Sequence, residues 1–167
     1  RGIDLLNDKL DQAVGKVYIE RHFPAESKPM MISMVEDIRA ALKIRIENLS
    51  WMTPETKTAA LAKLEKIDAK IAYPDKWRSF NKLAVRPGDL VGNIKRIRQF
   101  DAAYFAALLK KPVDKAIWFV GPQTVNAFYS PERNEIFVPA GYIQSPLFDP
   151  HADAAINYGA IGSIIGH

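Results

Sequence analysis

Apolar residues at helical spacing dominate the first part of the chain. From Leu6 onward they recur every three or four positions, which predicts one helix that ends at Phe23-Pro24. A longer apolar stripe runs from Met31 to Leu49, with charged residues on the opposite face. Two successive amphipathic helices are therefore expected before residue 50.

A third helix is expected to begin at Thr53-Pro54-Glu55. Threonine is a good N-cap, proline suits the first turn, and the helix dipole favours a glutamate there. The apolar stripe that follows covers 60–71 and predicts that the helix continues through it. Trp51 precedes this start, and we expect its ring to pack in the core at the corner between the two helices.

The segment 74–88 is rich in turn residues, so we interpret it as a loop with a short strand at 83–85. Asp89 is then expected to cap a long helix whose apolar face includes Leu90 and Phe105. Its basic outer face is interpreted as a solvated surface, because no aromatic residues alternate with the cations as they do in nucleic-acid grooves.

The pattern changes after residue 112. Two strand-like segments, 124–129 and 135–138, flank a polar loop at 130–134 and predict a β-hairpin. A final helix is expected over 154–167. The fold class predicted is mainly α with a small β-hairpin, α+β.

We predict a helical region over 1–111 and a mixed region over 112–167. No flexible Gly/Ser-rich stretch separates the two regions, so the boundary is interpreted as a change of layer.

Composition narrows the possible classes of protein. The 167 residues are 48% apolar and 25% charged, which is typical of a globular chain. There is no cysteine, which excludes disulfides, cysteine–zinc sites and thiol nucleophiles. A net charge of +4, from 23 basic and 19 acidic side chains, is too small to indicate nucleic-acid binding. No apolar run reaches the roughly 18 residues of a membrane span, so no transmembrane segment is expected in this chain.

The residue types alone do not define a catalytic site. The three histidines, His22, His151 and His167, are not spaced to share a helix face. Solvent-exposed or structural roles are the simplest interpretation of His22 and His151, the latter near the start of the last helix. Three glycines at helical spacing in 159–166 are typical of a helix against which another backbone packs closely.

Two blocks of sequence near the C-terminal end carry a strong resemblance to a known family. Residues 125–130, 133–136 and 139–141 form the first block, and Asn157–His167 form the second. Both blocks, in this order, closely resemble the neprilysin-like zinc metallopeptidases. Weaker matches lie upstream, at Trp51-Met52, at Tyr73-Pro74-Asp75 and in 111–114.

The resemblance implies a role for His167. It matches the first histidine of the His-Glu-x-x-His motif, in which two histidines one turn apart bind zinc and the glutamate acts as the base. The implied fold is a helical bundle that leads into the start of a zincin-like catalytic domain. One Zn²⁺ is expected per complete enzyme, and its site is expected to be incomplete in this chain. The implied partners are a peptide substrate and the remainder of the catalytic domain.

The resemblance also gives Asn126 and Ala127 a role in substrate binding. In this family the asparagine side chain and the alanine backbone hold the main chain of the peptide beside the metal. An exposed strand edge suits such a role, because its free N–H and C=O groups pair with an extended peptide. Phe128 and Tyr129 are expected to be packing residues. Ala160 stands where relatives often have glycine, and we expect no loss of function from it.

The implied function is part of a zinc-dependent endopeptidase, and the chain alone is expected to be inactive. The main alternative is a non-catalytic helical interaction module. A nucleic-acid binder is a weaker alternative. The resemblance implies an exported, periplasmic or cell-surface protein. We also expect the last helix to fray over 162–167 and to expose Ile161, Ile164 and Ile165. Substrate preference, organism and oligomeric state stay open.

Overall fold

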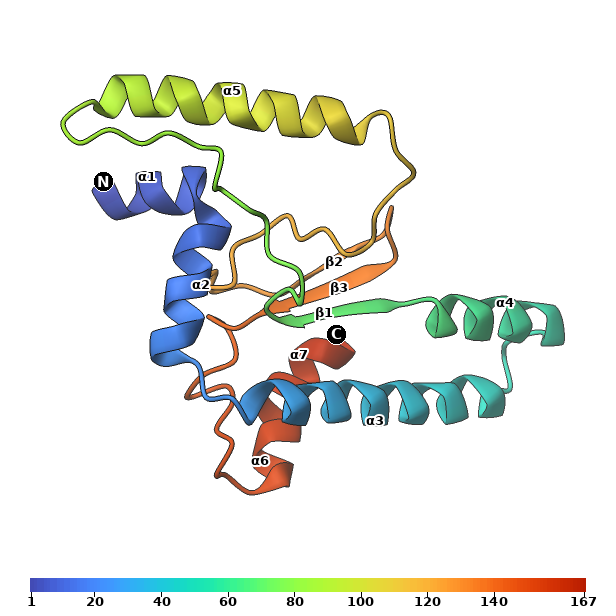
Figure 1. The fold of residues 1–167 in the computed structure, drawn as a ribbon. Coiled ribbons are helices and arrows are strands. Elements are labelled where there is room, and N and C mark those ends of the chain that lie inside the picture. Colours follow the sequence, from blue (N-terminus) through green and yellow to red (C-terminus); the bar gives the residue numbers. More distant parts are fainter.

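The computed structural model describes all of residues 1–167 and combines helices with one three-stranded sheet (Figure 1). In chain order the elements are α1 (Gly2–Lys9), α2 (Asp11–His22), α3 (Ser27–Asn48), α4 (Pro54–Glu65), β1 (Asp68–Ala72), α5 (Leu90–Leu108), β2 (Phe128–Ser130), β3 (Glu135–Pro139), α6 (Ala154–Asn157), the π-helical turn η1 (Tyr158–Gly162) and α7 (Ser163–Gly166). The mixed α+β class predicted from the sequence is confirmed.

The first predicted helix is two helices. Leu10 leaves the helical region, with φ −134° and ψ 37°, and separates α1 from α2. Tertiary contacts of α2 account for the break. The Gln12 amide donates to the Trp118 carbonyl at 3.2 Å, and Gly15 lies so close to Pro122 that a Cβ there would be 2.4 Å from its ring. The prediction of one continuous helix was therefore wrong, although its end before Phe23 is confirmed.

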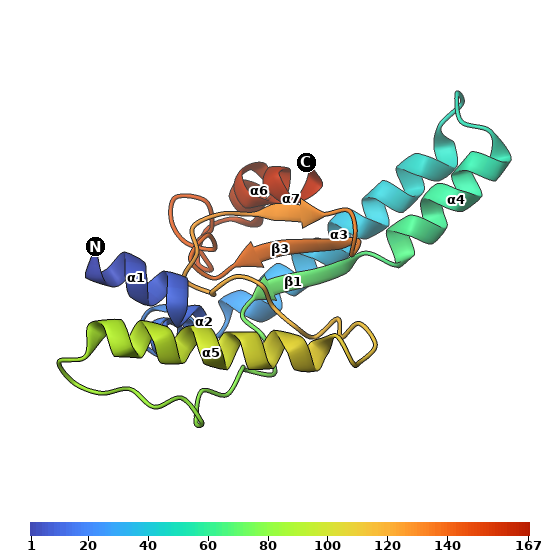
Figure 2. The same ribbon diagram turned by 90° about the horizontal axis from the view of Figure 1, so that it is seen from above.

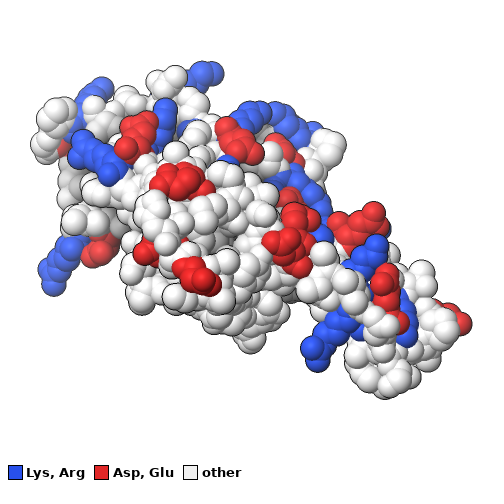
Figure 3. Space-filling view, turned by 90° about the horizontal axis from the view of Figure 1, so that it is seen from below, with Lys and Arg blue, Asp and Glu red and all other residues white.

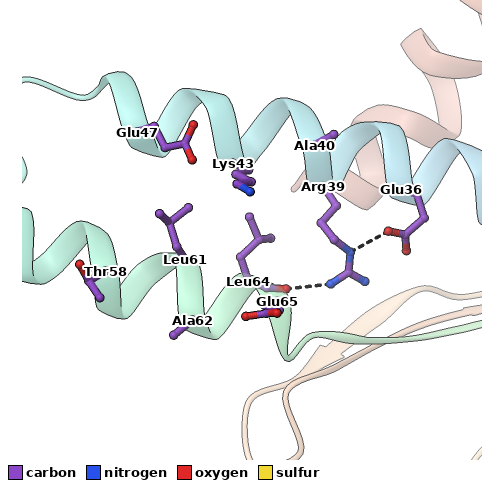
Figure 4. A pocket seen from close by; sticks show the side chains of 10 residues that line it. All are labelled: Glu36, Arg39, Ala40, Lys43, Glu47, Thr58, Leu61, Ala62, Leu64 and Glu65. Carbon is purple, nitrogen blue, oxygen red and sulfur yellow. Dashed lines mark hydrogen bonds and ion pairs between the residues drawn. The ribbon is translucent and has the colours of Figure 1, made fainter.

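Helices α3 and α4 form a hairpin that projects from the rest of the molecule (Figure 2). The predicted cap is present, since the Thr53 hydroxyl accepts from the Thr56 N–H at 3.3 Å. Arg39 of α3 joins the two helices by donating to the Leu64 carbonyl of α4 at 2.8 Å (Figure 4). It also donates to the Ile67 carbonyl, just after α4, at 3.0 Å. Trp51 is 74% exposed at the hairpin turn, so the expected core packing of its ring was wrong.

Strand β1 replaces the end of the third predicted helix. Helix α4 ends at Glu65, and Asp68–Ala72 pairs in parallel with β3, from Asp68 opposite Glu135 to Ala72 opposite Pro139. The apolar residues of 60–71 satisfy a helical period, but the last of them lie in a short run that also suits a buried strand. The strand expected at 83–85 is absent, and these residues are loop.

The predicted hairpin is present with a shorter first strand. Strand β2 covers only Phe128–Ser130 and pairs antiparallel with β3, while residues 124–127 lead into it without strand geometry. Asn134 ends the turn with φ 53°, a conformation that asparagine tolerates. The strand order is β1-β3-β2, so β1 and β2 form the two edges of the sheet.

The main core lies on the sheet face that α3 and the C-terminal helix cover (Figure 1). Ile71 and Val138 point to this face and pack with Met31, Met34 and Val35 of α3. On the opposite face the Phe137 ring packs between those of Phe128 and Trp118, at centroid distances of 4.9 and 5.8 Å. Residues from both predicted regions thus share one sheet and one core, and the division at residue 112 stays a prediction.

Helix α5 begins as predicted, because the Asp89 carboxylate accepts from the Gly92 N–H at 3.0 Å. Ile97 is buried, but Leu90 and Phe105 are 60% and 51% exposed, so their predicted inward orientation was wrong. No helix in this structure has the length and apolar character needed to cross a membrane.

Candidate metal and substrate-binding site

His167 follows α7 and has a solvent-exposed side chain. Its backbone N–H donates to the Ser163 carbonyl at 3.0 Å, which continues the helical pattern. The imidazole makes no hydrogen bond to the protein, so both ring nitrogens are available to a ligand. No group of three or more His, Asp or Glu side chains in this chain is arranged to hold a metal ion.

The helix that ends at His167 is fixed to the rest of the fold at its beginning. Asp153 caps it by accepting from the Ala155 N–H at 2.8 Å. The Asn157 side chain is buried and bonds both ways with the backbone of Asp149, at 3.1 and 2.8 Å. A third bond runs from the Ile161 N–H to the Leu147 carbonyl at 3.2 Å.

Helix α3 holds the same helix through a side-chain contact. The Tyr158 hydroxyl donates to the Asp37 carboxylate at 2.5 Å. This hydrogen bond raises the pKa of Tyr158, with burial and the Asp37 charge as smaller causes. The phenol therefore stays protonated and remains a donor at physiological pH. The helix that ends at His167 is thus oriented by a residue far from it in sequence.

Close packing at the glycines is limited to one position. A Cβ at Gly162 would meet the sulfur of Met34 at 3.6 Å, whereas Cβ atoms at Gly159 and Gly166 would meet nothing within 4 Å. Ile161 is fully buried, which contradicts the expected exposure of its side chain. Residues 158–162 adopt a π-helical turn, a feature that is frequent near functional sites.

Asn126 and Ala127 lie immediately before β2, at one edge of the sheet. The exposed Asn126 side chain turns back on its own backbone, where its Oδ1 accepts from the Ala127 N–H at 2.8 Å. Ala127 is half-buried against the main core. Phe128 stacks on Phe137, in keeping with a packing role, although it is 37% exposed. Tyr129 is 40% exposed and its hydroxyl donates to Asn134 at 2.8 Å on the surface, so its expected packing role is not confirmed.

The segment of chain that precedes Asn126 is held in place by its close contact with Gly141. The Gly141 N–H donates to the Pro122 carbonyl at 2.8 Å, and a Cβ on Gly141 would lie 2.4 Å from the carbonyl oxygen of Gln123. Only glycine allows this close backbone approach. The segment 122–124 is therefore held in place just before the proposed substrate-binding residues.

The candidate residues flank two elements, since His167 follows α7 and Asn126 and Ala127 precede β2. The end of the C-terminal helix lies on the sheet face that α3 covers (Figure 1). His22 and His151 are also exposed, and neither forms a metal-binding group with His167. His151 does not cap the last helix, because its contact is a backbone donation to Asp149. The zinc and peptide roles of His167, Asn126 and Ala127 stay predictions.

Sequence reasoning missed the buried carboxylate of Glu135. Its side chain is 0% exposed, and its Oε2 accepts from the Arg133 guanidinium at 2.7 Å. Arg133 also donates to the Asp114 carbonyl at 3.2 Å. A charged residue at the start of an apolar strand was the available signal, since buried charges in proteins are normally paired.

Comparison with known proteins finds matches to one peptidase family in two parts of the chain. Models of peptidase family M13 match residues 1–74 and 126–167. Rat endothelin-converting enzyme-like 1 is 36% identical over 96% of this chain, which covers 22% of that protein. Mouse neprilysin is 35% identical over 100% of this chain, which covers 23% of it.

Solved structures of two bacterial proteins are also similar to this chain in sequence and in fold. The open state of the Mycobacterium tuberculosis zinc metalloprotease Zmp1 is 48% identical, with a TM-score of 0.92 over 100% of this chain and 26% of that one. PepO from Lactobacillus rhamnosis is 32% identical, with a TM-score of 0.88 over 96% of this chain and 26% of that one. The chain thus spans about a quarter of the length of these relatives.

Proposed function

The chain belongs to peptidase family M13, and from this premise we propose that it forms part of a zinc-dependent endopeptidase. In this proposal His167 is a zinc ligand, and Asn126 and Ala127 bind the main chain of the substrate. One observation carries the proposal. A helix that ends in a free, exposed imidazole packs on the same sheet whose open edge, β2, follows directly after Asn126 and Ala127.

The residues present fit one part of a zinc site. The His167 imidazole is exposed and has no competing hydrogen bond, as a metal ligand requires. A catalytic zinc needs about three protein ligands, and no cluster of that size exists here. In this proposal the other ligands come from the remainder of the catalytic domain. Bound zinc would supply Lewis-acid polarisation of a carbonyl and of a water molecule.

The role of this chain in catalysis is to orient the substrate and one ligand. Strand β2 has a free edge, so an extended peptide can pair with the backbone near Ala127. The Asn126 Oδ1 accepts from the Ala127 N–H, whereas its Nδ2 makes no hydrogen bond and can donate to a peptide carbonyl without losing that contact. Rotation of the Asn126 side chain would in addition free the Ala127 N–H to bind the substrate.

The test uses a longer chain from the same gene and a quenched fluorescent peptide. We expect hydrolysis by the longer chain, its loss with a zinc chelator, and its loss in the His167→Ala variant. Asn126→Ala is expected to raise KM about tenfold or more, as removal of a substrate hydrogen bond does. Thr124→Ala, a nearby change outside the proposed contacts, is the control.

The chain of 167 residues alone is expected to be inactive. With one imidazole it should bind Zn²⁺ only weakly, with Kd above about 10 µM in calorimetry at neutral pH. Tight stoichiometric binding that survives His167→Ala would contradict the assignment.

If a folded longer chain does not cleave peptides, the non-catalytic interaction module replaces the peptidase proposal. An exported, periplasmic or cell-surface location is part of the proposal and is tested by cell fractionation.

A further inference from the structure

The second edge of the sheet, β1, carries backbone groups with no partner. In the parallel ladder with β3, the Asp68 N–H donates to the Asn134 carbonyl and the Ala72 carbonyl accepts from the Ala140 N–H. The residues that bond to β3 are therefore Asp68, Lys70 and Ala72. The N–H and C=O groups of the alternate residues point away from β3.

Three of these outward groups make no hydrogen bond. They are the N–H and C=O of Ala69 and the N–H of Ile71. No backbone or side-chain group forms a hydrogen bond with any of the three. The Ile71 carbonyl is taken by the Tyr73 N–H at 2.8 Å, through a turn at Ala72 with φ 63°. Ile71 is only 4% exposed, and an unpaired donor in such a residue is costly.

A hollow of about 220 Å³ runs beside this edge. Its lining includes Ala69 and Ile71 of β1, Lys28 and Ile32 of α3, and Ala116 and Trp118. Figure 2 shows β1 at the border of the sheet opposite β2, so this hollow is separate from the proposed substrate edge. The residues that carry the unpaired backbone groups thus line a recess beside β1.

The charges around the hollow favour an acidic partner. Lys28 pairs with Asp75, and Lys70 pairs with Asp68, at 2.7 and 2.6 Å. Lys76 also lines the hollow, is exposed, and has no ion pair. The site therefore carries one uncompensated positive charge, which a carboxylate would neutralise.

We propose that the β1 edge binds an extended acidic peptide segment as a fourth strand. The Ala69 N–H, the Ala69 C=O and the Ile71 N–H would form three backbone hydrogen bonds with it. Side chains of a strand alternate between faces. One set therefore lies against Ile32, which is 45% exposed, and the other points toward Lys76. A segment of alternating apolar and acidic residues fits this arrangement.

The proposal does not depend on the peptidase proposal, because β1 and β2 are different edges. The probe is a fluorescein-labelled peptide Glu-Val-Glu-Val-Glu with Gly-Ser flanks, titrated into the chain of 167 residues at low ionic strength. Saturable binding is expected from fluorescence anisotropy. The matched Lys-Val peptide is expected to bind at least about tenfold more weakly, because of its opposite charge.

Three variants separate the backbone and charge contributions. Ala69→Pro removes an outward donor without removing a ladder bond, so it should abolish binding. Lys76→Glu should weaken binding about fivefold or more, since it reverses the unpaired charge. Lys43→Glu, on an exposed part of α3 that does not line the hollow, should leave it unchanged. If Ala69→Pro fails to fold by circular dichroism, Lys76→Glu and the exchange measurement below decide.

Amide hydrogen exchange locates the bound peptide. On saturation the Ala69 and Ile71 amides should exchange at least about tenfold more slowly, as newly paired amides do. Slowing confined to residues 128–130 would place the peptide on the β2 edge and overturn the proposal. Absence of saturable binding at about 1 mM peptide would overturn it as well.

Discussion

Gly141 is a residue at which a single added methyl group should have a large effect. In Gly141→Ala the new Cβ would lie 2.4 Å from the Gln123 carbonyl oxygen and 2.9 Å from that of Thr124. Both contacts are with backbone, so the segment before Asn126 has to move. We expect a loss of about 1–3 kcal/mol in the free energy of unfolding, measured by urea titration.

Gly159→Ala is the matched control for this substitution. A Cβ at Gly159 would meet nothing within 4 Å, and the residue lies in the helical segment before His167. Alanine should therefore raise the free energy of unfolding by about 0.5–1 kcal/mol. Equal destabilisation by the two substitutions would show that the close approach at Gly141 does not govern stability.

At the residue scale, local features were predictable and distant partners were not. The caps Thr53 and Asp89 act within three residues of themselves, so the sequence around each was sufficient. Trp51 is exposed because no distant segment covers the hairpin turn, and Glu135 is buried where β3 pairs with β1, far from it in sequence. Hydrophobicity alone predicts a buried Trp51 and an exposed Glu135, and the structure shows the opposite for both.

At the scale of elements, the start of α5 should be sensitive to acid. The hydrogen bond from Arg96 lowers the pKa of Asp89 below its ordinary 3.8, and the Gly92 N–H lowers it further. A lowered pKa means that the contribution of Asp89 is present at neutral pH and is lost as the pH falls through the folded-state value. Asp89→Asn should thus reduce the loss of stability between about pH 5 and about pH 2.

Arg96→Gln provides the control for that prediction. It removes the main cause of the lowered pKa and leaves the Asp89 cap intact. We expect it to reduce the same pH dependence in urea titrations, and the double variant should show little further change. An unchanged pH slope in both single variants would contradict the role of the Asp89–Arg96 pair.

Most elements were predictable from periodicity, but β1 was not. Its short apolar run continues the pattern of α4, and only pairing with β3, more than sixty positions away, defines it as a strand. The same limit applies to the candidate site. The motif resemblance pointed to His167, Asn126 and Ala127. The sheet order, which makes β2 an edge, comes from the non-local pairing of β1.

The face drawn in Figure 3 has a mostly uncharged central area with a few acidic side chains on and around it, while most Lys and Arg side chains lie farther out. No large continuous region of one sign is present on this face. Long-range steering of one class of ligand is therefore weak on this face. Recognition should depend on local groups, such as the strand edges, more than on net charge.

At the scale of the whole molecule, Arg78 connects three parts of the fold. Its guanidinium donates to Asp101 of α5 at 2.6 Å and lies 4.2 Å from the centre of the Tyr104 ring. Its backbone N–H donates to Gln12 of α2 at 2.9 Å. Since Leu90 and Phe105 of α5 are largely exposed, much of the attachment of this helix depends on Arg78.

Arg78→Ala should therefore separate the stability of α5 from that of the sheet. The loss of the ion pair and ring contacts is expected to cost about 2–3 kcal/mol. Amides of 97–105 should then exchange faster while those of 135–139 stay protected, because proteins open in local units. Arg98→Ala, on the exposed face of α5 and without an ion pair, is the control and should change neither segment. If both segments lose protection equally, α5 and the sheet unfold as one cooperative unit, and the attachment through Arg78 is not a separate contribution.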